Sequence, residues 1–549
     1  MKNKLDRRKA VMSRSIKLGH CVCNPKKPCP CETFEKHNIC TCAGEKLPVK
    51  TGNVRLSRYV RKAGCASKIG QADLKRILSK LPEVTNPAVL VGTAAGDDAA
   101  VYRLDGRFSL VQTVDVFSPN VDDAYMFGKI AAANSVSDVY AMGGKPLTAL
   151  SVVGFPIEEL DGSIMEEMLR GGMEKLEEAG CSLVGGHSIN DEEVKCGFAV
   201  TGIIDHDKFV TRDSAEPGDA LVLTKPLGTG MIAFAAQIGR ISESRLNDAG
   251  KIMASLNKDA AELMIKHHAH ACTDVTGFAL MGHLVEMITG SGVSAEIDIE
   301  SLPVMAPVQA CLENEILPGA IERNYEYAMA WFDAEDSVEE KHIPIFFDPQ
   351  TSGGLLVALP EDKAREYVKE MKKRGHDAAT IIGRIVEKKG DSRVHITGSG
   401  LKNFFGEFRE SDLLEKEKAE VMMKEEKQSP AAETNEEEPC CANPPGFEDE
   451  EAGDYAAENP VLRSPALFAN FMKEANRPGL IGAKEKKITA IALSIAQKCR
   501  PCLKIHIKKA LDMGISKAAI DEAAWLAISF CGSPAMLFYK EVCEELGIK

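Results

Sequence analysis

Residues 109–144 read SLVQTVDVFSPNVDDAYMFGKIAAANSVSDVYAMGG and have the pattern of a strand followed by a long helix. The helix is expected over Asp122–Met142, ending at Gly143-Gly144, because glycine readily adopts the left-handed conformation that stops a helix. Further strands are expected at 88–92, where the run is continuously apolar and predicts a buried strand, at 99–102 and at 182–184. From Gly218 the alternation of strands and helices restarts. We therefore predict an α/β (α+β) core with two lobes, at 54–213 and 214–405.

Three segments outside this core differ from it in composition. Residues 1–50 include a run, 21–42, that holds six of the 17 cysteines, and they have few side chains that would form a core. Residues 406–456 are acidic and interrupted by proline, which predicts a disordered linker that buries too little apolar surface to fold. Residues 457–549 carry Ala, Leu, Ile and Lys at helical spacing and predict an all-α domain.

The net charge of −14 is concentrated in one place, since residues 410–458 hold 17 acidic and 4 basic side chains. No large basic surface for nucleic acid is implied, and the basic residues 1–17 are expected to form a solvated tail rather than an RNA contact. No apolar run approaches the roughly 18 residues that span a bilayer, and no apolar stretch follows the basic N-terminus. We expect a cytoplasmic protein without membrane contact.

Carboxylates gather where the predicted elements begin or end. Any one of them has the ordinary alternative of capping a helix or filling a turn. As a set beside glycine-rich turns, they indicate hard oxygen ligands for Mg²⁺ and a polyphosphate. The set comprises Asp97 and Asp98 before one strand, Asp115 closing the next, Asp138 on the same helix face as Asn134, and Asp274 in a separate segment.

A short glycine-flanked loop, Gly64-Cys-Ala-Ser-Lys68, carries a thiol and an ammonium group. Such a loop can close over phosphates, but one cysteine near one lysine is a weak indication of catalysis by itself.

These features belong to a longer series of ordered motifs. The series comprises GCASK at 64–68, GDDAAVY at 96–102, TVD at 113–115, AANSVSD at 132–138, AMGGKP at 141–146, GGHS at 185–188, TDVTGF at 273–278, PG at 318–319 with RN at 323–324, and DPQTSGG at 348–354. With these motifs, residues 54–405 closely resemble the selenophosphate synthetase family, part of a superfamily of two-lobed ATP-binding proteins that also serves purine and thiamine synthesis.

The resemblance implies a reaction in which selenide, ATP and water give selenophosphate, AMP and phosphate. It also implies a homodimer whose N-terminal lobes form a β-barrel-like interface that holds ATP. Many relatives have a second cysteine where this chain has Ser67, so a mechanism that needs a cysteine pair in the loop is not implied. Carried over by motif, the catalytic residues are Cys65 and Lys68, the Mg²⁺ ligands are Asp98, Asp138 and Asp274, and the ATP-binding residues are Lys68, Ala95, Gly96, Asp97, Asp115, Asp138, Gly185, Gly186 and His187.

Near the C-terminus, Cys499-Arg-Pro-Cys502 and His506 have the spacing of one helix face, which allows the imidazole to exchange protons with the thiols. Most of 457–549 resembles the carboxymuconolactone decarboxylase/alkylhydroperoxidase D-like family. That resemblance implies an oligomer-forming thiol oxidoreductase. Lys487 stands where the family often has a carboxylate, with Glu485 nearby, so peroxidase activity is not expected.

The N-terminal cysteines form three Cys-x-Cys pairs, and four of the six thiolates would suffice for tetrahedral zinc. The Cys-x-x-Cys spacing usual in zinc knuckles is absent from 21–42, and the pairs resemble the catalytic subunit of ferredoxin–thioredoxin reductase. That resemblance implies a [4Fe–4S] cluster; Zn²⁺ and a disordered segment are the alternatives. The implied cluster ligands are Cys21, Cys29, Cys31 and Cys40, and the implied redox pair is Cys23 with Cys42.

Two other functions compete with selenophosphate synthesis. In the first alternative, the core phosphorylates another small molecule, as superfamily relatives do. In the second, the chain is mainly a redox or metal-binding protein that nucleotide binding regulates. The loop from Cys65 to Lys68 favours the synthetase. The flanking thiol segments indicate a thiol-redox or electron-donor protein as a further partner.

Overall fold

The computed structural model describes residues 4–18, 29–30, 34, 40, 43, 54–60, 62–82, 84–92, 96–205, 207–388, 390–391, 393–408, 413, 482–496, 500–531, 536, 538–540, 542–543 and 546. The chain divides into two compact units, residues 1–427 and 428–549. Nearly all of the linker predicted at 406–456 lies outside the described residues. Among the helices that are described, none is both long and apolar enough to cross a membrane.

The first lobe is a six-stranded sheet in the order β1-β2-β3-β6-β4-β5. All its pairings are antiparallel except that of β4 with β5, which are joined by the crossover helix α5. The strands predicted at 88–92, 99–102, 109–114 and 182–184 are confirmed, although β1 is a half-buried edge strand rather than a fully buried one. The strands are β1 (Val89–Val91), β2 (Ala100–Arg103), β3 (Phe108–Phe117), β4 (Lys145–Phe155), β5 (Ser182–Asn190) and β6 (Lys195–Asp205).

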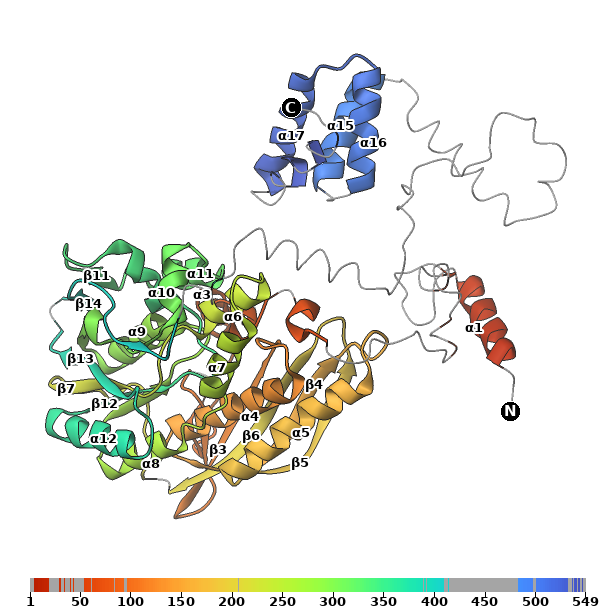
Figure 1. Cartoon of the computed structure of the whole chain (residues 1–549). Coiled ribbons are helices and arrows are strands. Elements are labelled where there is room, and N and C mark those ends of the chain that lie inside the picture. Colours follow the sequence, from red (N-terminus) through yellow and green to blue (C-terminus); the bar gives the residue numbers. More distant parts are fainter. Residues whose placement is uncertain are drawn as a thin grey trace, which may run out of the picture. The chain divides into compact units, whose positions relative to one another are not determined.

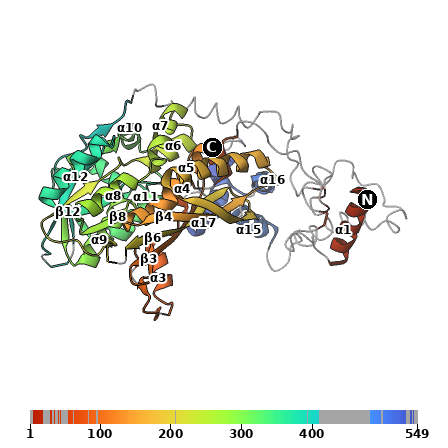
Figure 2. The same ribbon diagram turned by 90° about the horizontal axis from the view of Figure 1, so that it is seen from below.

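Helices α4 (Ala124–Ala141) and α5 (Gly162–Ala179) lie side by side over one face of this sheet (Figures 1 and 2). Their backbones touch at glycines, since a Cβ on Gly128 would lie 1.8 Å from the carbonyl oxygen of Met168. The helix predicted at 122–142 is α4. It is buried along most of its length, so its polar residues, including Asn134, lie inside the protein.

The opposite face of the sheet is exposed and apolar. Val114, Leu147, Leu150, Val184 and Ile189 on β3, β4 and β5 are each more than a third exposed. Ala199 on β6 pairs with Val114 on β3 and with Leu150 on β4, and Leu150 also pairs with Gly185 on β5. One row of cross-strand neighbours therefore crosses all four strands. An uncovered apolar sheet face of this kind is typical of an interaction surface.

The second lobe begins with β7 and contains a seven-stranded mixed sheet in the order β11-β14-β9-β13-β7-β12-β8, which confirms the restart predicted from Gly218. Helices α8 and α12 pack against β12, and α9 packs against β8 and β9. The strands are β7 (Asp219–Leu223), β8 (Ala271–Asp274), β9 (Ser294–Asp298), β11 (Phe332–Ala334), β12 (Leu355–Pro360), β13 (Thr380–Val386) and β14 (Val394–Thr397), with a separate pair β10 (Val304–Met305) and β15 (Phe404–Phe405).

The remaining helices of this unit lie around the two sheets and in the N-terminal segment. They are α1 (Lys4–Leu18), α3 (Gln71–Leu78), α6 (Thr229–Gln237), α7 (Glu243–Met253), α8 (Lys258–Lys266), α9 (Ala279–Ser291), α10 (Pro307–Glu313), α11 (Ala320–Ala328) and α12 (Glu361–Lys373), with 3₁₀ turns η2 (Leu56–Tyr59), η3 (Cys65–Ser67), η4 (Ile299–Ser301) and η5 (Glu340–Phe347).

Most described residues of the C-terminal unit are helical, with short turns between the helices, which confirms the predicted all-α domain. It contains α15 (Ala483–Ala496), α16 (Arg500–Asp512) and α17 (Lys517–Cys531). Ile491, Leu503, Ile507 and Ile520 belong to its buried apolar core.

Candidate active site

The cysteine loop is a tight turn held at both ends. Gly64 has φ +57°, a left-handed conformation that a residue with a Cβ adopts only at a cost, and its N–H donates to the carbonyl of Ser118 at 3.0 Å. Cys65 then begins η3, whose end is closed by the N–H of Lys68 donating to the Cys65 carbonyl at 3.1 Å. The turn therefore presents Cys65 and Lys68 on one short segment.

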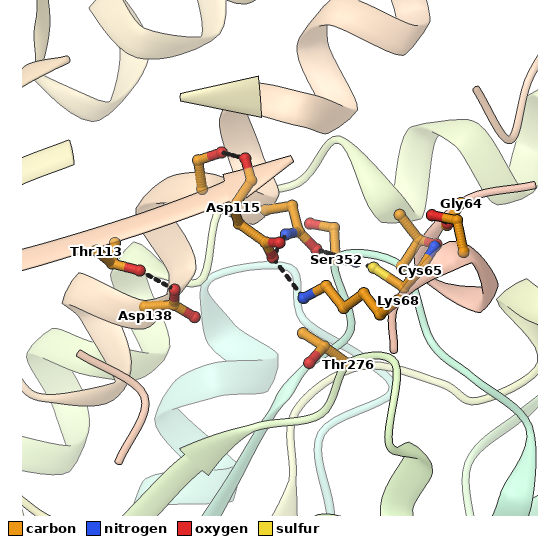
Figure 3. A network of polar contacts seen from close by, with 12 residues as sticks. Gly64, Cys65, Lys68, Thr113, Asp115, Asp138, Thr276 and Ser352 are labelled. Atoms are coloured by element: carbon orange, nitrogen blue, oxygen red, sulfur yellow. Dashed lines mark hydrogen bonds and ion pairs between the residues drawn. The ribbon is translucent and has the colours of Figure 1, made fainter. Parts of the chain in front are cut away.

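Lys68 reaches from this loop to the first sheet. Its Nζ forms an ion pair with Asp115 Oδ2 at 2.8 Å, and Figure 3 shows the extended side chain. Asn134 Nδ2 donates to the same carboxylate oxygen. Burial alone would lower the pKa of Lys68, but the charge and hydrogen bond of Asp115, together with other nearby groups, outweigh burial, so the pKa is raised and the ammonium stays charged. Asp115 lies two residues before the end of β3 rather than closing it, so its buried side chain points toward α4.

Cys65 is 1% exposed, and its Sγ lies 3.9 Å from Asn134 Oδ1. Its backbone N–H donates to Thr351 Oγ1 at 3.1 Å. Burial, which Lys68 opposes, raises the pKa of the Cys65 thiol to about 12. At neutral pH the group is therefore a thiol, not the thiolate that acts as a nucleophile or soft ligand. Either the loop opens before the sulfur reacts, or a bound cation lowers the pKa.

Three carboxyl groups lie beside the ion pair, of which Asp274 is buried and Asp98 and Asp138 are partly buried. Burial and the charges of Asp274 and neighbouring aspartates raise the pKa values of Asp98 and Asp138 well above the usual range. Burial likewise raises the pKa of Asp274 to about 6, and the charge of Lys68 acts in the opposite direction. Asp98 accepts a hydrogen bond from Thr273 at 2.9 Å, and Thr113 donates to Asp138 (Figure 3). The structure thus brings together the three residues predicted to hold a metal.

One oxygen of Asp98 and one of Asp274 are buried without a hydrogen-bond partner, which suits these residues to a cation. Among the described residues, however, no three Asp, Glu, His or Cys side chains form a closed metal-binding group. Mg²⁺ usually takes only one or two carboxylates and completes its octahedron with water and substrate phosphates. The donor set therefore fits Mg²⁺ carried in with a polyphosphate better than a resident ion.

Gly96 and Asp97 lie beside these carboxylates, and Ala95 lies outside the described residues. Asp97 accepts hydrogen bonds from the N–H groups of Asp98 at 2.9 Å and of Arg212 at 3.3 Å. Gly96 has φ +61°. The turn at 96–98 is therefore fixed by Asp97.

The predicted ATP residues Gly185, Gly186 and His187 are not brought to this cluster. They lie on β5, the exposed edge of the sheet. Asp115 on β3 and Gly186 on β5 lie in one cross-strand row that passes through β6 and β4. Three strand spacings, about 14 Å, therefore separate the two residues.

A buried carboxylate that the sequence did not indicate joins the loop to the second lobe. Glu286 on α9 accepts from Gln71 at 2.5 Å and Tyr327 at 2.7 Å, and pairs with Lys75 at 2.5 Å and Arg212 at 2.6 Å. Burial would raise its pKa, but Arg212 and the other partners hold it below the usual value. An isolated Glu in an apolar helix carries no pattern that distinguishes this role.

In the C-terminal unit, Cys502 and His506 lie one turn apart on α16, and Cys502 is bonded in a disulfide. Cys499 lies outside the described residues. Lys487 Nζ lies 3.3 Å from His506 Nδ1, and an ammonium group only donates, so Nδ1 is the acceptor. Burial and the charge of Lys487 lower the pKa of His506 to about 4. The imidazole is therefore neutral at neutral pH and a weak base.

In the N-terminal segment, Cys29 and Cys40 are described; Cys29 has a free thiol, and Cys40 is buried. Cys21, Cys23, Cys31 and Cys42 lie outside the described residues, as do Cys440 and Cys441. The iron–sulfur cluster and its zinc alternative stay predictions.

Comparison with known families covers most of both units. Residues 96–204 match AIR synthase related protein, N-terminal domain, and 216–396 match AIR synthase related protein, C-terminal domain. Residues 463–545 match the Carboxymuconolactone decarboxylase family. The two-lobed core and the resemblance of 457–549 to the carboxymuconolactone decarboxylase family are confirmed, whereas the resemblance of residues 21–42 to ferredoxin–thioredoxin reductase stays a prediction.

Curated relatives match the core over nearly their whole length. Selenide, water dikinase 2 of Peptoclostridium acidaminophilum is 43% identical over 343 residues, 62% of this chain and 98% of that protein. Selenide, water dikinase of Caldanaerobacter subterraneus subsp. tengcongensis is 44% identical over 335 residues, 61% and 96% respectively. A solved thiamine-monophosphate kinase from Stenotrophomonas maltophilia is 20% identical with a TM-score of 0.42, covering 61% of this chain and 98% of that one.

Proposed function

The chain belongs to the selenide, water dikinase family, and from this we propose that its core converts selenide, ATP and water into selenophosphate, AMP and phosphate. The observation that carries the site assignment is the convergence of Lys68, Asp115 and three buried or partly buried carboxyl groups behind the Cys65 loop.

The charges of this cluster suit a polyphosphate. Lys68 and Asp115 neutralise one another while no nucleotide is bound, so incoming phosphates compete with Asp115 for the ammonium. Asp98, Asp138 and Asp274 would hold Mg²⁺, which supplies positive charge to the phosphate oxygens when bound. Asp97, by fixing the turn at 96–98, orients Asp98 toward that position.

Cys65 is proposed to handle selenium rather than phosphate. The thiol and selenide are both reduced and polarisable, so Cys65 would hold selenium by contact and a weak S–H hydrogen bond, with no sulfur–selenium bond and no change of oxidation state, whereas phosphate oxygens prefer hard donors such as Lys68. The side chain already lies beside Asn134, which also bonds Asp115, so selenium held there is next to the proposed phosphate site.

We assign Gly185, Gly186 and His187 to a nucleotide site completed by a second copy of the chain. Within one chain these residues lie away from Lys68, on the sheet edge whose apolar face is uncovered. A homodimer through that face would cover Val114, Leu150 and Val184 and bring β5 of each copy to the other copy's site. The family resemblance supports the same arrangement.

The test is anaerobic incubation of the protein with ATP, Mg²⁺ and selenide, followed by phosphorus NMR and AMP measurement. The wild-type chain is expected to form selenophosphate and AMP together. Asp98→Asn and Asp274→Asn should lower selenide-dependent AMP formation by about 100-fold or more, because each removes one of the charges that hold the cation. Asp377→Asn, at an exposed position in the second lobe, is the matched control and should leave the rate unchanged. Wild-type protein that forms AMP without selenophosphate contradicts the proposal.

For the C-terminal unit we propose thiol–disulfide chemistry at Cys499 and Cys502. The family match over 463–545, the disulfide at Cys502 and a neutral imidazole one turn away support it. The natural role would be to supply or accept electrons near a readily oxidised substrate. Selenide-independent thiol turnover in the presence of ATP would instead favour a mainly redox protein.

A further inference from the structure

A cavity of about 220 Å³ lies between the cysteine loop and the second lobe. The loop contributes Lys62, Ala63 and Ala66, and the second lobe contributes Phe234, Arg323 and Thr351 among others. The motif at 318–324, which the proposed ATP and Mg²⁺ sites do not use, forms part of its wall. The cavity therefore has no role in the function proposed so far.

The cysteine loop separates this cavity from the phosphate cluster. Ala63 and Ala66 flank Cys65 in the chain and face the cavity, whereas the Cys65 sulfur lies toward Asn134. Thr351 lines the cavity, and its hydroxyl accepts the Cys65 N–H. A small shift of the turn η3 would thus turn the thiol from one compartment toward the other.

The charged groups of the cavity are cationic. Arg323 donates from one terminal nitrogen to the Ala66 carbonyl at 3.3 Å, and its Nε is buried and has no hydrogen-bond partner among the described residues. Lys62 is a second cation, and it is exposed. No carboxylate is among the described residues that line the cavity. A buried guanidinium N–H without an acceptor is costly, and an anion in the cavity would supply the acceptor.

The N-terminus of α6 does not contribute to the binding of an anion in this cavity. Gly230 lines the cavity, but its N–H already donates to Asp348 at 3.1 Å, and the N–H groups of Gly228 and Thr229 donate to Gln350. The attraction for an anion therefore rests on Arg323 and Lys62.

Apart from Thr351 and Gln237, whose amide donates to the carbonyls of Ser57 and Val60, the remaining side chains of the lining are apolar, with alanine, proline and phenylalanine. Phosphate is strongly hydrated and would lose much of its solvation there, whereas a soft, weakly hydrated monoanion would lose little. At neutral pH selenide is present as hydroselenide, HSe⁻, which is such an ion. We propose that the cavity is the hydroselenide-binding site from which selenium reaches Cys65, an inference that rests on the proposed function.

Kinetics separate this site from the nucleotide site. Arg323→Met keeps the length of the side chain but removes its charge, and the KM for selenide should rise about tenfold or more, as expected for loss of a charge-assisted hydrogen bond. The KM for ATP should change less than about twofold, and Arg323→Lys should restore part of the selenide affinity. Ala66→Leu, which fills the cavity, should also raise the KM for selenide. Arg393→Met, at an exposed arginine, is the control.

A direct readout does not depend on turnover. Crystals of the full chain soaked anaerobically with hydroselenide, without ATP, should show anomalous scattering at the selenium edge beside Arg323 and Ala66. The peak should be lost in Arg323→Met. Selenium bound only elsewhere, or an Arg323→Met enzyme with an unchanged KM for selenide, overturns the inference while leaving selenophosphate synthesis intact. If the wild-type chain forms no selenophosphate, the proposed function itself fails.

Discussion

The sulfur of Cys65 is in a protonated, enclosed state. Its thiol has a pKa of about 12 because it is buried, and Lys68, the nearest cation, is paired with Asp115. Because Lys68 is already paired with Asp115, it offsets the effect of burial on the thiol only in part. This links the two substrates at the level of single residues, since phosphate binding and sulfur reactivity both depend on the same ammonium group.

Replacement of this sulfur should separate selenium chemistry from nucleotide binding. Cys65→Ser is expected to lower kcat/KM for selenide by about 100-fold or more, because a hydroxyl is hard and stays protonated, while the dissociation constant for ATP stays within about twofold. Isothermal titration with ATP and steady-state rates at limiting selenide measure the two effects. Equal rates for both proteins would remove Cys65 from the mechanism.

The pKa also predicts how the resting thiol reacts with alkylating reagents. In the wild-type protein without ATP, alkylation of Cys65 by iodoacetamide should accelerate about tenfold per pH unit between pH 7 and 10, because the thiolate fraction of a group with pKa about 12 is still rising there. Mass spectrometry resolves this residue from the other cysteines. A plateau near pH 8.5 would show that the loop is open in solution.

Among the elements, the loop and α3 are held to the second lobe by Glu286. Its four partners come from α3, α11 and the segment before β7, so one carboxylate ties three parts of the fold. The loop that carries Cys65 and Lys68 directly precedes α3. The position of Cys65 and Lys68 therefore depends on Glu286, which touches neither of them.

Glu286→Gln should release this segment. The change keeps shape but removes the charge, so we expect a loss of about 1.5–3 kcal/mol in unfolding free energy. Hydrogen exchange should increase over residues 62–78, and Glu322→Gln, at an exposed site on α11, serves as the control. Unchanged exchange in that segment would show that other contacts hold the loop.

His506 on α16 has a lowered pKa because its ring is buried and because the Lys487 ammonium on α15 lies beside it. Lys487→Glu removes the second cause, so it should raise the His506 pKa from about 4 and speed thiol–disulfide exchange at pH 7, whereas Lys508→Glu should do neither. NMR titration, with His506→Gln to assign the signal, measures the pKa. Since the folded pKa lies below the unfolded one, stability from this group is present above pH 6.5 and is lost as pH falls toward 4. Titration near 6.5 in the wild-type chain would contradict the buried geometry.

The sequence motifs predicted the helices and strands of the site better than they predicted the contacts between those elements. Helix α4 and strand β3 follow from apolar spacing and the glycine stop, and Asp98, Asp138 and Asp274 follow from family motifs. Glu286 and the Thr351 bond to Cys65 arise only when distant segments meet, and no local pattern encodes them. The same limit applies to the Cys65 pKa, because burial depends on the whole lobe rather than on neighbours in sequence.

At the scale of the whole molecule, thiol groups flank an enzyme whose substrate is readily oxidised. The C-terminal unit carries a disulfide at Cys502. The N-terminal segment carries three Cys-x-Cys pairs, and Cys29, which belongs to one of them, is a free thiol. Both flanking segments would then serve one purpose, which is to keep selenium reduced while the core uses it. A purely structural N-terminal zinc site would not contribute to that purpose, because Zn²⁺ has no redox chemistry.

The metal bound by residues 21–42 decides between these two roles. Protein purified anaerobically and reconstituted with iron and sulfide should be brown and hold about four irons per chain. Cys29→Ser with Cys31→Ser should lose that iron, because both are predicted cluster ligands, whereas Cys23→Ser with Cys42→Ser should keep it, because that pair is predicted to form the redox disulfide. Metal analysis and visible absorption measure both outcomes. Uptake of zinc alone, or iron retained after Cys29 and Cys31 are replaced, rules out the cluster and leaves the C-terminal thiols as the remaining candidate electron source.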